Sequence, residues 1–333
     1  MTHPRRIDAD PDGWPTFFVL GAQRSGTTWL HRVLSAHPGV YVTRSKEPDF
    51  LYRKILRQPI ADYRDLFRPP ECDLAGPRGD LSVNYAMLGD EAVRRVHRLM
   101  PDLRLILIIR DPIDRTWSQL NLLSRLMRPD GRDRQRTPLD RASPERLRHL
   151  LTDPRFQRRS DYAGQIERWT RVFGRESLLI ERYEDITADP ESVVGRILRH
   201  IGADDSWTPD DPSLLRTRVY GSGSESMPRL VEYELAKRFE PMLARLGGLF
   251  DGNLTAWRDR IESVLSDPPD DRRRLPDLGW RAVAAARNSA YRLYDRRRQA
   301  RICRRLDDAA QEIAAGGRPG KPATESIPVV AAE

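Results

Sequence analysis

Residues 21–28, GAQRSGTT, combine two glycines with an arginine and hydroxyl side chains in a pattern suited to binding a phosphate group. Gly21 and Gly26 have the spacing of the NTPase phosphate loop, G-x-x-x-x-G-K-[ST]. Thr27 stands where the NTPase lysine would be, and the nearest cation is Arg24, inside the loop. The alternative interpretation is an ordinary glycine-containing turn before a helix.

The flanking residues favour the phosphate loop. An apolar run at 17–20 precedes it, and a helical pattern begins at Thr27. Backbone N–H groups and the helix dipole converge on an anion at such a strand-to-helix turn. Hydroxyl groups add further donors. We therefore predict a binding loop formed by Gln23, Arg24, Ser25, Gly26, Thr27 and Thr28.

A second candidate lies at the end of the most apolar run, LRLILIIR at 103–110. An NTPase places a metal-binding aspartate at the end of such a strand. Here Arg110 ends the strand and Asp111 follows it. Because an arginine repels a metal ion and attracts a second anion, the pattern predicts two anionic groups on the ligand and no metal.

Together these segments resemble the sulfotransferases that use 3′-phosphoadenosine 5′-phosphosulfate (PAPS). The resemblance rests on QRSGTTW at 23–29 and IIRDPIDRTWSQ at 108–119, and extends over roughly 17–257. It implies that PAPS is the sulfuryl donor, that Arg24 is the catalytic cation, and that Arg110 and Ser118 bind the 3′-phosphate. A transferring sulfuryl group carries less charge than a phosphoryl group, so loop donors and one cation suffice without a metal. A looser match implies further 3′-phosphate contacts from Arg218, Gly221, Ser222 and Gly223.

The segment TRSKEPDFLY at 43–52 resembles the KE..FF segment of glycan-modifying and bacterial members. This implies that Glu47 is the general base and that Lys46 contacts the sulfuryl group or the acceptor. An exposed Lys–Glu pair in a turn is the alternative. The histidines have no matching context, and we expect structural roles for them. We expect the same of Glu184 and Asp185, whose strand is taken to lie far from the motifs.

At two places in the sequence, the residues allow either a binding role or a structural one. Trp29 matches the aromatic residue that stacks on adenine in many members, but its helical position fits a core residue equally well. Asp80, Ser82 and Tyr85, in GDLSVNY, either line the acceptor pocket or finish a strand. A lysine common in this segment of glycan-type members is missing, because Leu81 occupies its position.

Apolar strand-like runs alternate with helical patterns over about the first 260 residues. This alternation predicts an α/β fold with a mostly parallel central sheet and helices on both faces. The resemblance implies the P-loop NTPase-like sulfotransferase version of that fold. We expect a flexible N-terminus at 1–15, a sulfotransferase domain at 16–265, and a basic helical extension with a disordered tail at 266–333. The expected strands are 16–21, 39–43, 79–83, 103–110 (the central one) and 177–183, and the expected helices are 27–36, 91–100, 113–126, 161–173 and 191–201.

The composition of the 333 residues, 39% hydrophobic and 32% charged, is typical of a soluble globular protein. No apolar run approaches the ~20 residues that span a bilayer, and the first residues lack the apolar segment of a signal peptide. The two cysteines, Cys72 and Cys303, are far apart. We therefore expect no disulfide framework or zinc site, and a cytoplasmic location.

The net charge of +8 is concentrated near the C-terminus, where 281–305 holds nine arginines and one acidic residue, Asp295. The rest of the chain is near neutral, so we expect no nucleic-acid partner. The arginine-rich stretch is predicted to be a helix that either packs back on the domain or lies on an anionic membrane surface.

The leading hypothesis is direct in-line transfer of a sulfuryl group from PAPS to a hydroxyl or amine of a small-molecule acceptor. Carbohydrates, glycolipids and secondary metabolites are the acceptor classes considered. The alternatives are a P-loop nucleotide kinase or NTPase, and a non-catalytic protein that binds phosphate or a membrane surface.

Overall fold

The computed structural model describes residues 13–68, 76–126, 139, 147, 150–217, 226–269 and 277–315. Five parallel strands form one sheet in the order β2-β3-β1-β4-β5. The predicted α/β fold with a parallel sheet is confirmed, although β1, and not the 103–110 strand, is central. The strands are β1 Phe17–Gly21, β2 Tyr41–Val42, β3 Arg78–Asp80, β4 Arg104–Ile109 and β5 Leu178–Arg182.

The neighbouring inner strands β1 and β4 carry apolar side chains on both faces. Phe18 and Leu20 join one core cluster, whereas Phe17 and Val19 join the other. Successive side chains of a strand point to opposite faces, so a run without polar residues must be covered twice. Burying each such side chain stabilises the fold by roughly 1.5–3 kcal/mol.

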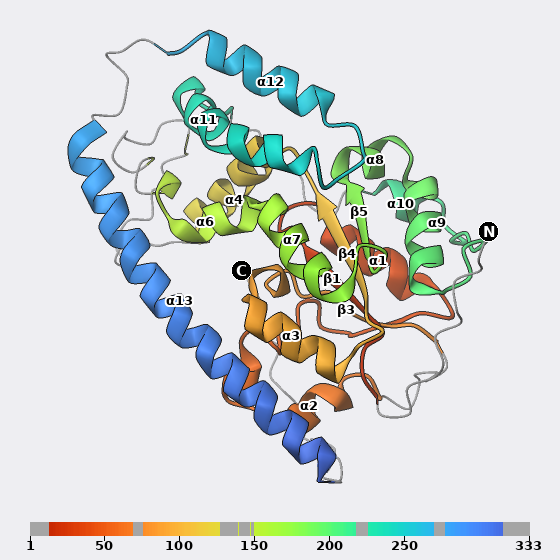
Figure 1. Ribbon diagram of the computed structural model, residues 1–333. Helices are drawn as coiled ribbons and strands as arrows, with labels where there is room; N and C mark the ends of the chain where they lie inside the picture. Colours follow the sequence, from red (N-terminus) through yellow and green to blue (C-terminus); the bar gives the residue numbers. More distant parts are fainter. Residues whose placement is uncertain are drawn as a thin grey trace.

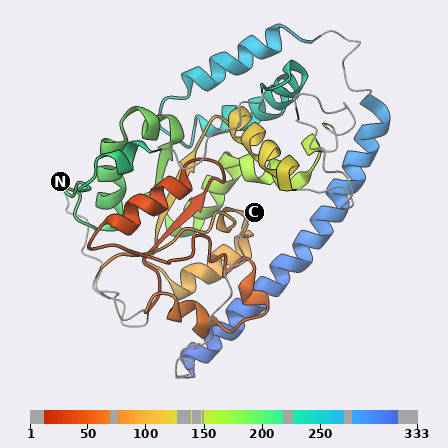
Figure 2. The same cartoon turned by 180° about the vertical axis from the view of Figure 1, so that it is seen from behind.

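Helices cover both faces of the sheet (Figures 1 and 2). One face packs against α1 Thr27–Ala36, α8 Tyr183–Ala188, α9 Pro190–Ile201 and α10 Ser213–Arg216. The other packs against α3 Asp90–Leu99, α4 Pro112–Leu126, α7 Tyr162–Phe173, α11 Arg229–Leu246 and α12 Thr255–Ser266. The five predicted helices are observed, each within one residue at both ends. The shorter elements are η1 Lys54–Leu56, α2 Ile60–Asp65, η2 Tyr85–Met87 and α6 Pro154–Ser160.

The arginine-rich stretch lies within α13 Asp277–Ala314, which runs along one side of the molecule (Figure 1). Ile302 and Leu306 of α13 are buried in the core. Arg298 Nη2 donates to the Tyr52 carbonyl at 2.6 Å, and Arg305 Nε donates to the Ile55 carbonyl at 2.8 Å. Of the two predicted roles, packing back on the domain is observed, and membrane contact stays a prediction.

None of the helices in the described part of the chain combines the length and apolarity needed to cross a membrane. Of the N-terminus expected to be flexible, 1–15, residues 1–12 lie outside the described residues, as does the tail at 316–333 that was expected to be disordered. Trp14, by contrast, is buried.

Candidate active site

The loop after β1 lies at the carboxyl edge of the sheet, where the chain connections reverse direction between β1 and β4. Ligands of open α/β sheets bind at such a switch point. Gly26 has a left-handed φ of 88° and immediately precedes α1. This backbone conformation favours glycine, and a Cβ at Gly26 would make a tight contact of 3.2 Å with Tyr183 Cδ2. Thr27 and Thr28 form the first turn of α1.

Three of the predicted binding residues meet at this loop. Arg24 Nε donates to Ser118 Oγ at 3.0 Å, and Arg110 Nη1 donates to the Arg24 carbonyl at 3.3 Å. The Arg110 guanidinium lies 4.8 Å from the centroid of the Tyr183 ring. Its ion pair with Asp114 is long, at 3.9 Å. The two motifs therefore form one cationic site.

Ser25 provides a direct test of whether the loop suits a phosphate or sulfate group. The residue is fully buried, and its Oγ has no hydrogen-bond partner among the described residues. A buried hydroxyl without a partner is unfavourable. An oxygen of an anionic ligand in the loop would accept from this hydroxyl, so the residues fit such a group.

Asp111 follows the Arg110 strand end but is occupied by structural contacts. Its Oδ1 accepts from the Ile113 N–H at 2.8 Å and caps α4. Its Oδ2 pairs with Arg260 Nη1 at 2.9 Å. Within the described ranges, no group of three or more His, Cys, Asp or Glu side chains is placed to hold a metal ion.

Lys46 and Glu47 lie in the loop that follows β2. Lys46 Nζ is 3.0 Å from Glu47 Oε1, and the side chains are 18% and 31% exposed. In the described part of the chain, the non-glycine residues with positive φ are Arg24 (71°), Glu47 (61°) and Asp49 (52°). Such backbone is unfavourable for residues with a Cβ and is concentrated at functional sites. The strain thus falls on the phosphate loop and on the loop that carries the predicted base.

The three residues predicted to contact substrate, Asp80, Ser82 and Tyr85, are buried in a hydrogen-bond network instead. Asp80 accepts from Ser82 Oγ, from Tyr85 OH at 2.7 Å and from Tyr63 OH at 2.9 Å. All three predicted residues are 0% exposed, so they do not line a pocket in this structure. Burial raises the pKa of Asp80 to about 6, against the effect of its hydroxyl donors. The alternative structural role is the one observed.

This buried network holds the loop of the predicted base. Ser82 Oγ accepts from the Asp49 N–H at 2.8 Å, and Tyr85 OH accepts from the Leu51 N–H at 3.1 Å. The network therefore fixes the backbone that follows Glu47.

Trp29, one of the predicted nucleotide contacts, lies in the core. Its side chain is 6% exposed, and Nε1 donates to the Leu215 carbonyl at 2.9 Å. A buried ring whose N–H is already bonded offers no open face to a base, so of its two roles the structure favours the core residue. Four other predicted contacts lie outside the described residues: Arg218, Gly221, Ser222 and Gly223.

A polar connection joins the phosphate loop to the loop after β2, and it was not predicted from the sequence. Arg159 of α6 donates Nη1 to Gln23 Oε1 in the phosphate loop and Nη2 to Asn84 Oδ1 at 2.8 Å. Asn84 Nδ2 donates to Asp49 Oδ2 at 2.8 Å, and burial raises the pKa of Asp49 to about 6. Burial lowers the pKa of Arg159, whose Nε has no hydrogen-bond partner in the described ranges. The only sequence signal for Arg159 is an arginine shortly before the helix 162–173. Arginines are common at such positions, so this signal alone does not indicate a functional residue.

The premise that placed Glu184 far from the motifs is wrong. Strand β5 pairs with β4, and Glu184 Oε1 accepts from the Asp111 N–H at 3.1 Å. Its Oε2 is buried without a hydrogen-bond partner among the described residues, and burial raises the pKa of Glu184. Glu184 therefore borders the candidate site beside Arg110.

The histidines near the motifs have structural contacts, as expected. His31 Nε2 lies 2.9 Å from the Thr43 carbonyl oxygen. His37 Nδ1 accepts from the Gly39 N–H at 3.0 Å. Tyr162, at the start of α7, is buried, and its OH donates to the Arg110 carbonyl at 2.9 Å.

Comparison with known proteins places these motifs in a family. The chain is 28% identical over 201 residues to human bifunctional heparan sulfate N-deacetylase/N-sulfotransferase 3, a match covering 57% of this chain and 22% of that protein. It is 29% identical over 196 residues to human heparan sulfate glucosamine 3-O-sulfotransferase 6, covering 57% of this chain and 52% of that protein. The chain thus spans about half or less of the length of these relatives.

A solved structure supports the same fold. The sulfotransferase from Alicyclobacillus acidocaldarius aligns with a TM-score of 0.56 and 24% identity, over 74% of this chain and 99% of that chain. The family model described as "Sulfotransferase domain" matches residues 15–213, which is more than half of the chain. This chain belongs to the sulfotransferase domain family.

Proposed function

We propose that the chain transfers a sulfuryl group from PAPS to a hydroxyl or amine of a carbohydrate. The observation that carries the proposal is the meeting of Arg24, Arg110 and Ser118 at one loop. The buried Ser25 hydroxyl of this loop has no partner among the residues that the structure describes. Family membership supports sulfuryl transfer. The names of relatives that act on heparan sulfate support a carbohydrate acceptor.

The phosphate loop and the Arg110 region would each bind one anionic end of the donor. When bound, PAPS supplies the sulfuryl group and a nucleotide leaving group. The backbone N–H groups of residues 23–28 and the Ser25 hydroxyl would hold its 5′-phosphosulfate, and Arg110 with Ser118 would hold its 3′-phosphate. Arg24 contacts both Ser118 and Arg110. Its guanidinium would stabilise negative charge that grows on the departing phosphate.

Glu47 is the proposed base. Its carboxylate would accept the acceptor proton as the new bond to sulfur forms and the bond between sulfur and the nucleotide phosphate oxygen breaks. The products are the sulfated acceptor and 3′,5′-bisphosphoadenosine. Lys46, 3.0 Å from Glu47, would give the sulfuryl oxygens a second cation.

Calorimetric titration with 3′,5′-bisphosphoadenosine, ATP and GTP tests the proposal, each with and without magnesium. We expect tight binding of 3′,5′-bisphosphoadenosine that is independent of magnesium and that weakens when the 3′-phosphate is removed. Tighter, magnesium-dependent binding of ATP would instead indicate a kinase or NTPase.

A further inference from the structure

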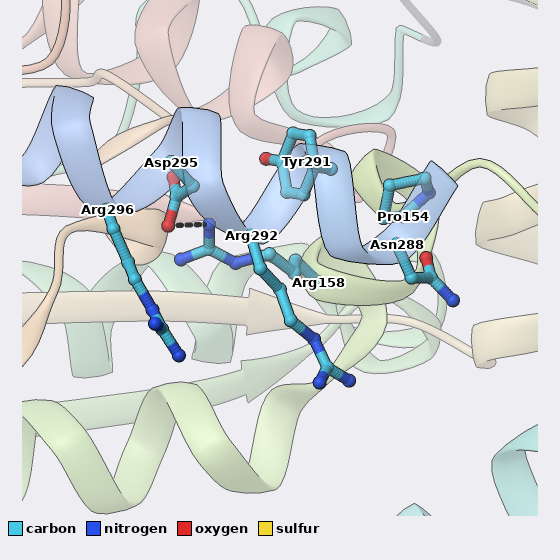
Figure 3. A pocket seen from close by; sticks show the side chains of 7 residues that line it. All are labelled: Pro154, Arg158, Asn288, Tyr291, Arg292, Asp295 and Arg296. Atoms are coloured by element: carbon cyan, nitrogen blue, oxygen red, sulfur yellow. Dashed lines mark ion pairs between the residues drawn. The ribbon is translucent and has the colours of Figure 1, made fainter. Parts of the chain in front are cut away.

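A pocket of about 340 Å³ lies between α6 and α13. Pro154 and Arg158 line it from α6. The α13 side is lined by Asn288, Tyr291, Arg292, Asp295 and Arg296 (Figure 3). Helix α13 lies beyond residues 15–213, the part of the chain that the family model matches.

The pocket has more positive than negative charge. Arg158 Nη1 pairs with Asp295 Oδ2 at 2.6 Å, and Asp295 is the acidic residue among the lining side chains. Arg292 and Arg296 have no ion pair or hydrogen bond to any described residue, and they extend from α13 in the same direction (Figure 3). Like charges one turn apart destabilise a helix, so an anion between them would be favourable.

The pocket also contains acceptors that lack donors. Asn288 Oδ1 and Asp295 Oδ1 are buried and have no hydrogen-bond partner among the residues that the structure describes. Buried oxygens of this kind are normally paired with an N–H or O–H group. Two free guanidinium groups and two unpaired acceptors together fit a ligand that carries both negative groups and hydroxyls. A sugar with a carboxylate or sulfate has this chemistry, whereas a simple inorganic anion has no hydroxyls to donate.

The position of the pocket connects it to the candidate active site. Arg158 faces the pocket, and the next residue, Arg159, donates to Gln23 of the phosphate loop. On the other side, Arg298 of α13 donates to the Tyr52 carbonyl, and its guanidinium lies 4.0 Å from the centroid of the Tyr52 ring. Tyr52 is five residues beyond Glu47. Helix α13 is therefore tied to the loop of the proposed base.

We propose that the α6–α13 pocket is an acceptor subsite that binds a carboxylate- or sulfate-bearing sugar unit of an oligosaccharide, beside the unit to be sulfated. This inference rests on the proposed function, because it names the substrate class of the same site. Arg292 and Arg296 are exposed. Both walls of the pocket are connected to the candidate site, through the contact of Arg159 with the phosphate loop and that of Arg298 with Tyr52. These connections favour an acceptor over a membrane surface.

The test is binding of a heparan sulfate hexasaccharide, with neutral maltohexaose as comparison, at saturating 3′,5′-bisphosphoadenosine. The pocket variant is Arg292→Gln with Arg296→Gln. The matched control is Arg301→Gln with Arg304→Gln, which removes two exposed arginines of the same helix that do not line the pocket. We expect the pocket variant to bind the sulfated hexasaccharide at least tenfold more weakly, and the control less than twofold more weakly. In turnover assays, KM should rise with kcat unchanged.

Three results would overturn the inference. Equal losses in the two variants would indicate general attraction to α13, and equal binding of maltohexaose would exclude charge recognition. Binding of anionic phospholipid vesicles that depends on Arg301 and Arg304, with no hexasaccharide binding, would indicate a membrane surface instead. The two proposals fail separately. If the unmodified chain does not bind 3′,5′-bisphosphoadenosine, the proposed function is rejected. If it binds the nucleotide but the pocket variant and the control variant bind the hexasaccharide equally well, only the subsite is rejected.

Discussion

Two polar clusters lie at the carboxyl ends of the neighbouring strands β3 and β1, and they differ in how completely they are hydrogen-bonded. The Asp80 carboxylate accepts from three hydroxyls, and two of these hydroxyls also accept from backbone N–H groups. Around the phosphate loop, Ser25 Oγ, Arg159 Nε and Glu184 Oε2 are buried without a hydrogen-bond partner in the described ranges. Fully paired buried groups stabilise a fold, whereas unpaired ones stay costly until a ligand arrives. The first cluster thus supports the candidate site, and the second is the one that we propose to bind the nucleotide.

The largest effect is expected from Glu47, which the first cluster positions. Glu47→Gln removes the proton acceptor and keeps the shape of the side chain, so kcat should fall by about 10²–10⁴-fold. The Kd for 3′,5′-bisphosphoadenosine should stay within about twofold. Steady-state kinetics and calorimetry measure the two quantities. Glu91→Gln, on the exposed surface of α3, is the control. Turnover retained by Glu47→Gln would remove this residue as the base.

The next effect concerns the binding cluster. Arg110→Ala should weaken 3′,5′-bisphosphoadenosine by about 10–100-fold, because hydrogen bonds to a charged group contribute roughly 1.5–3 kcal/mol. Adenosine 5′-phosphosulfate, which has no 3′-phosphate, should lose less affinity in the same titration. Some loss is expected even there, because Arg110 also donates to the Arg24 carbonyl. Equal losses for the two nucleotides would show that Arg110 does not read the 3′-phosphate.

The same contrast explains what the sequence could predict. Helix α1 was predicted at its observed bounds because apolar periodicity and the glycines before it are local signals. Arg24 and Ser118 are 94 positions apart, and only the paired motifs of a family joined them before the structure. Asp80 stayed ambiguous because its partner Tyr63 comes from α2, and no local pattern indicates that a tyrosine of that segment donates to the carboxylate at the end of β3. Arg159 was missed because its contacts depend on how α6 packs, which no local pattern encodes.

A smaller effect, on stability, is expected within the supporting cluster. Asp80→Asn leaves one side-chain oxygen for three hydroxyl donors, so the free energy of unfolding should fall by about 1–3 kcal/mol. The kcat should fall as well, because Ser82 and Tyr85 hold the backbone beyond Glu47. Chemical denaturation and steady-state kinetics check both changes. Loss of kcat without loss of stability would mean that Asp80 contacts substrate after all.

This variant also has a pH signature. The pKa of Asp80 is raised from 3.8 to about 6 in the folded chain, so the folded state holds more protons than the unfolded state between these values. The contribution of Asp80 to stability is therefore fully present below pH 3.8 and is lost as the pH rises through about 6. Consequently, the stability gap between the wild type and Asp80→Asn should be wider at about pH 4.5, below the folded-state pKa of about 6, than at about pH 7.5, above it.

The smallest effect is expected at Trp29 of α1. This helix begins in the phosphate loop and packs its apolar side chains in the core. Trp29→Phe keeps most of the buried apolar surface but removes the N–H that donates to the Leu215 carbonyl. Stability should fall by about 1 kcal/mol, the typical contribution of one hydrogen bond. The Kd for 3′,5′-bisphosphoadenosine should change less than about twofold, because the ring is not available to stack on adenine. A tenfold weaker Kd with unchanged thermal stability would contradict this and restore Trp29 to the nucleotide site. The first turn of α1 would then belong both to the core and to the binding loop. In that case, buried polar atoms without hydrogen-bond partners would not identify all residues of the site.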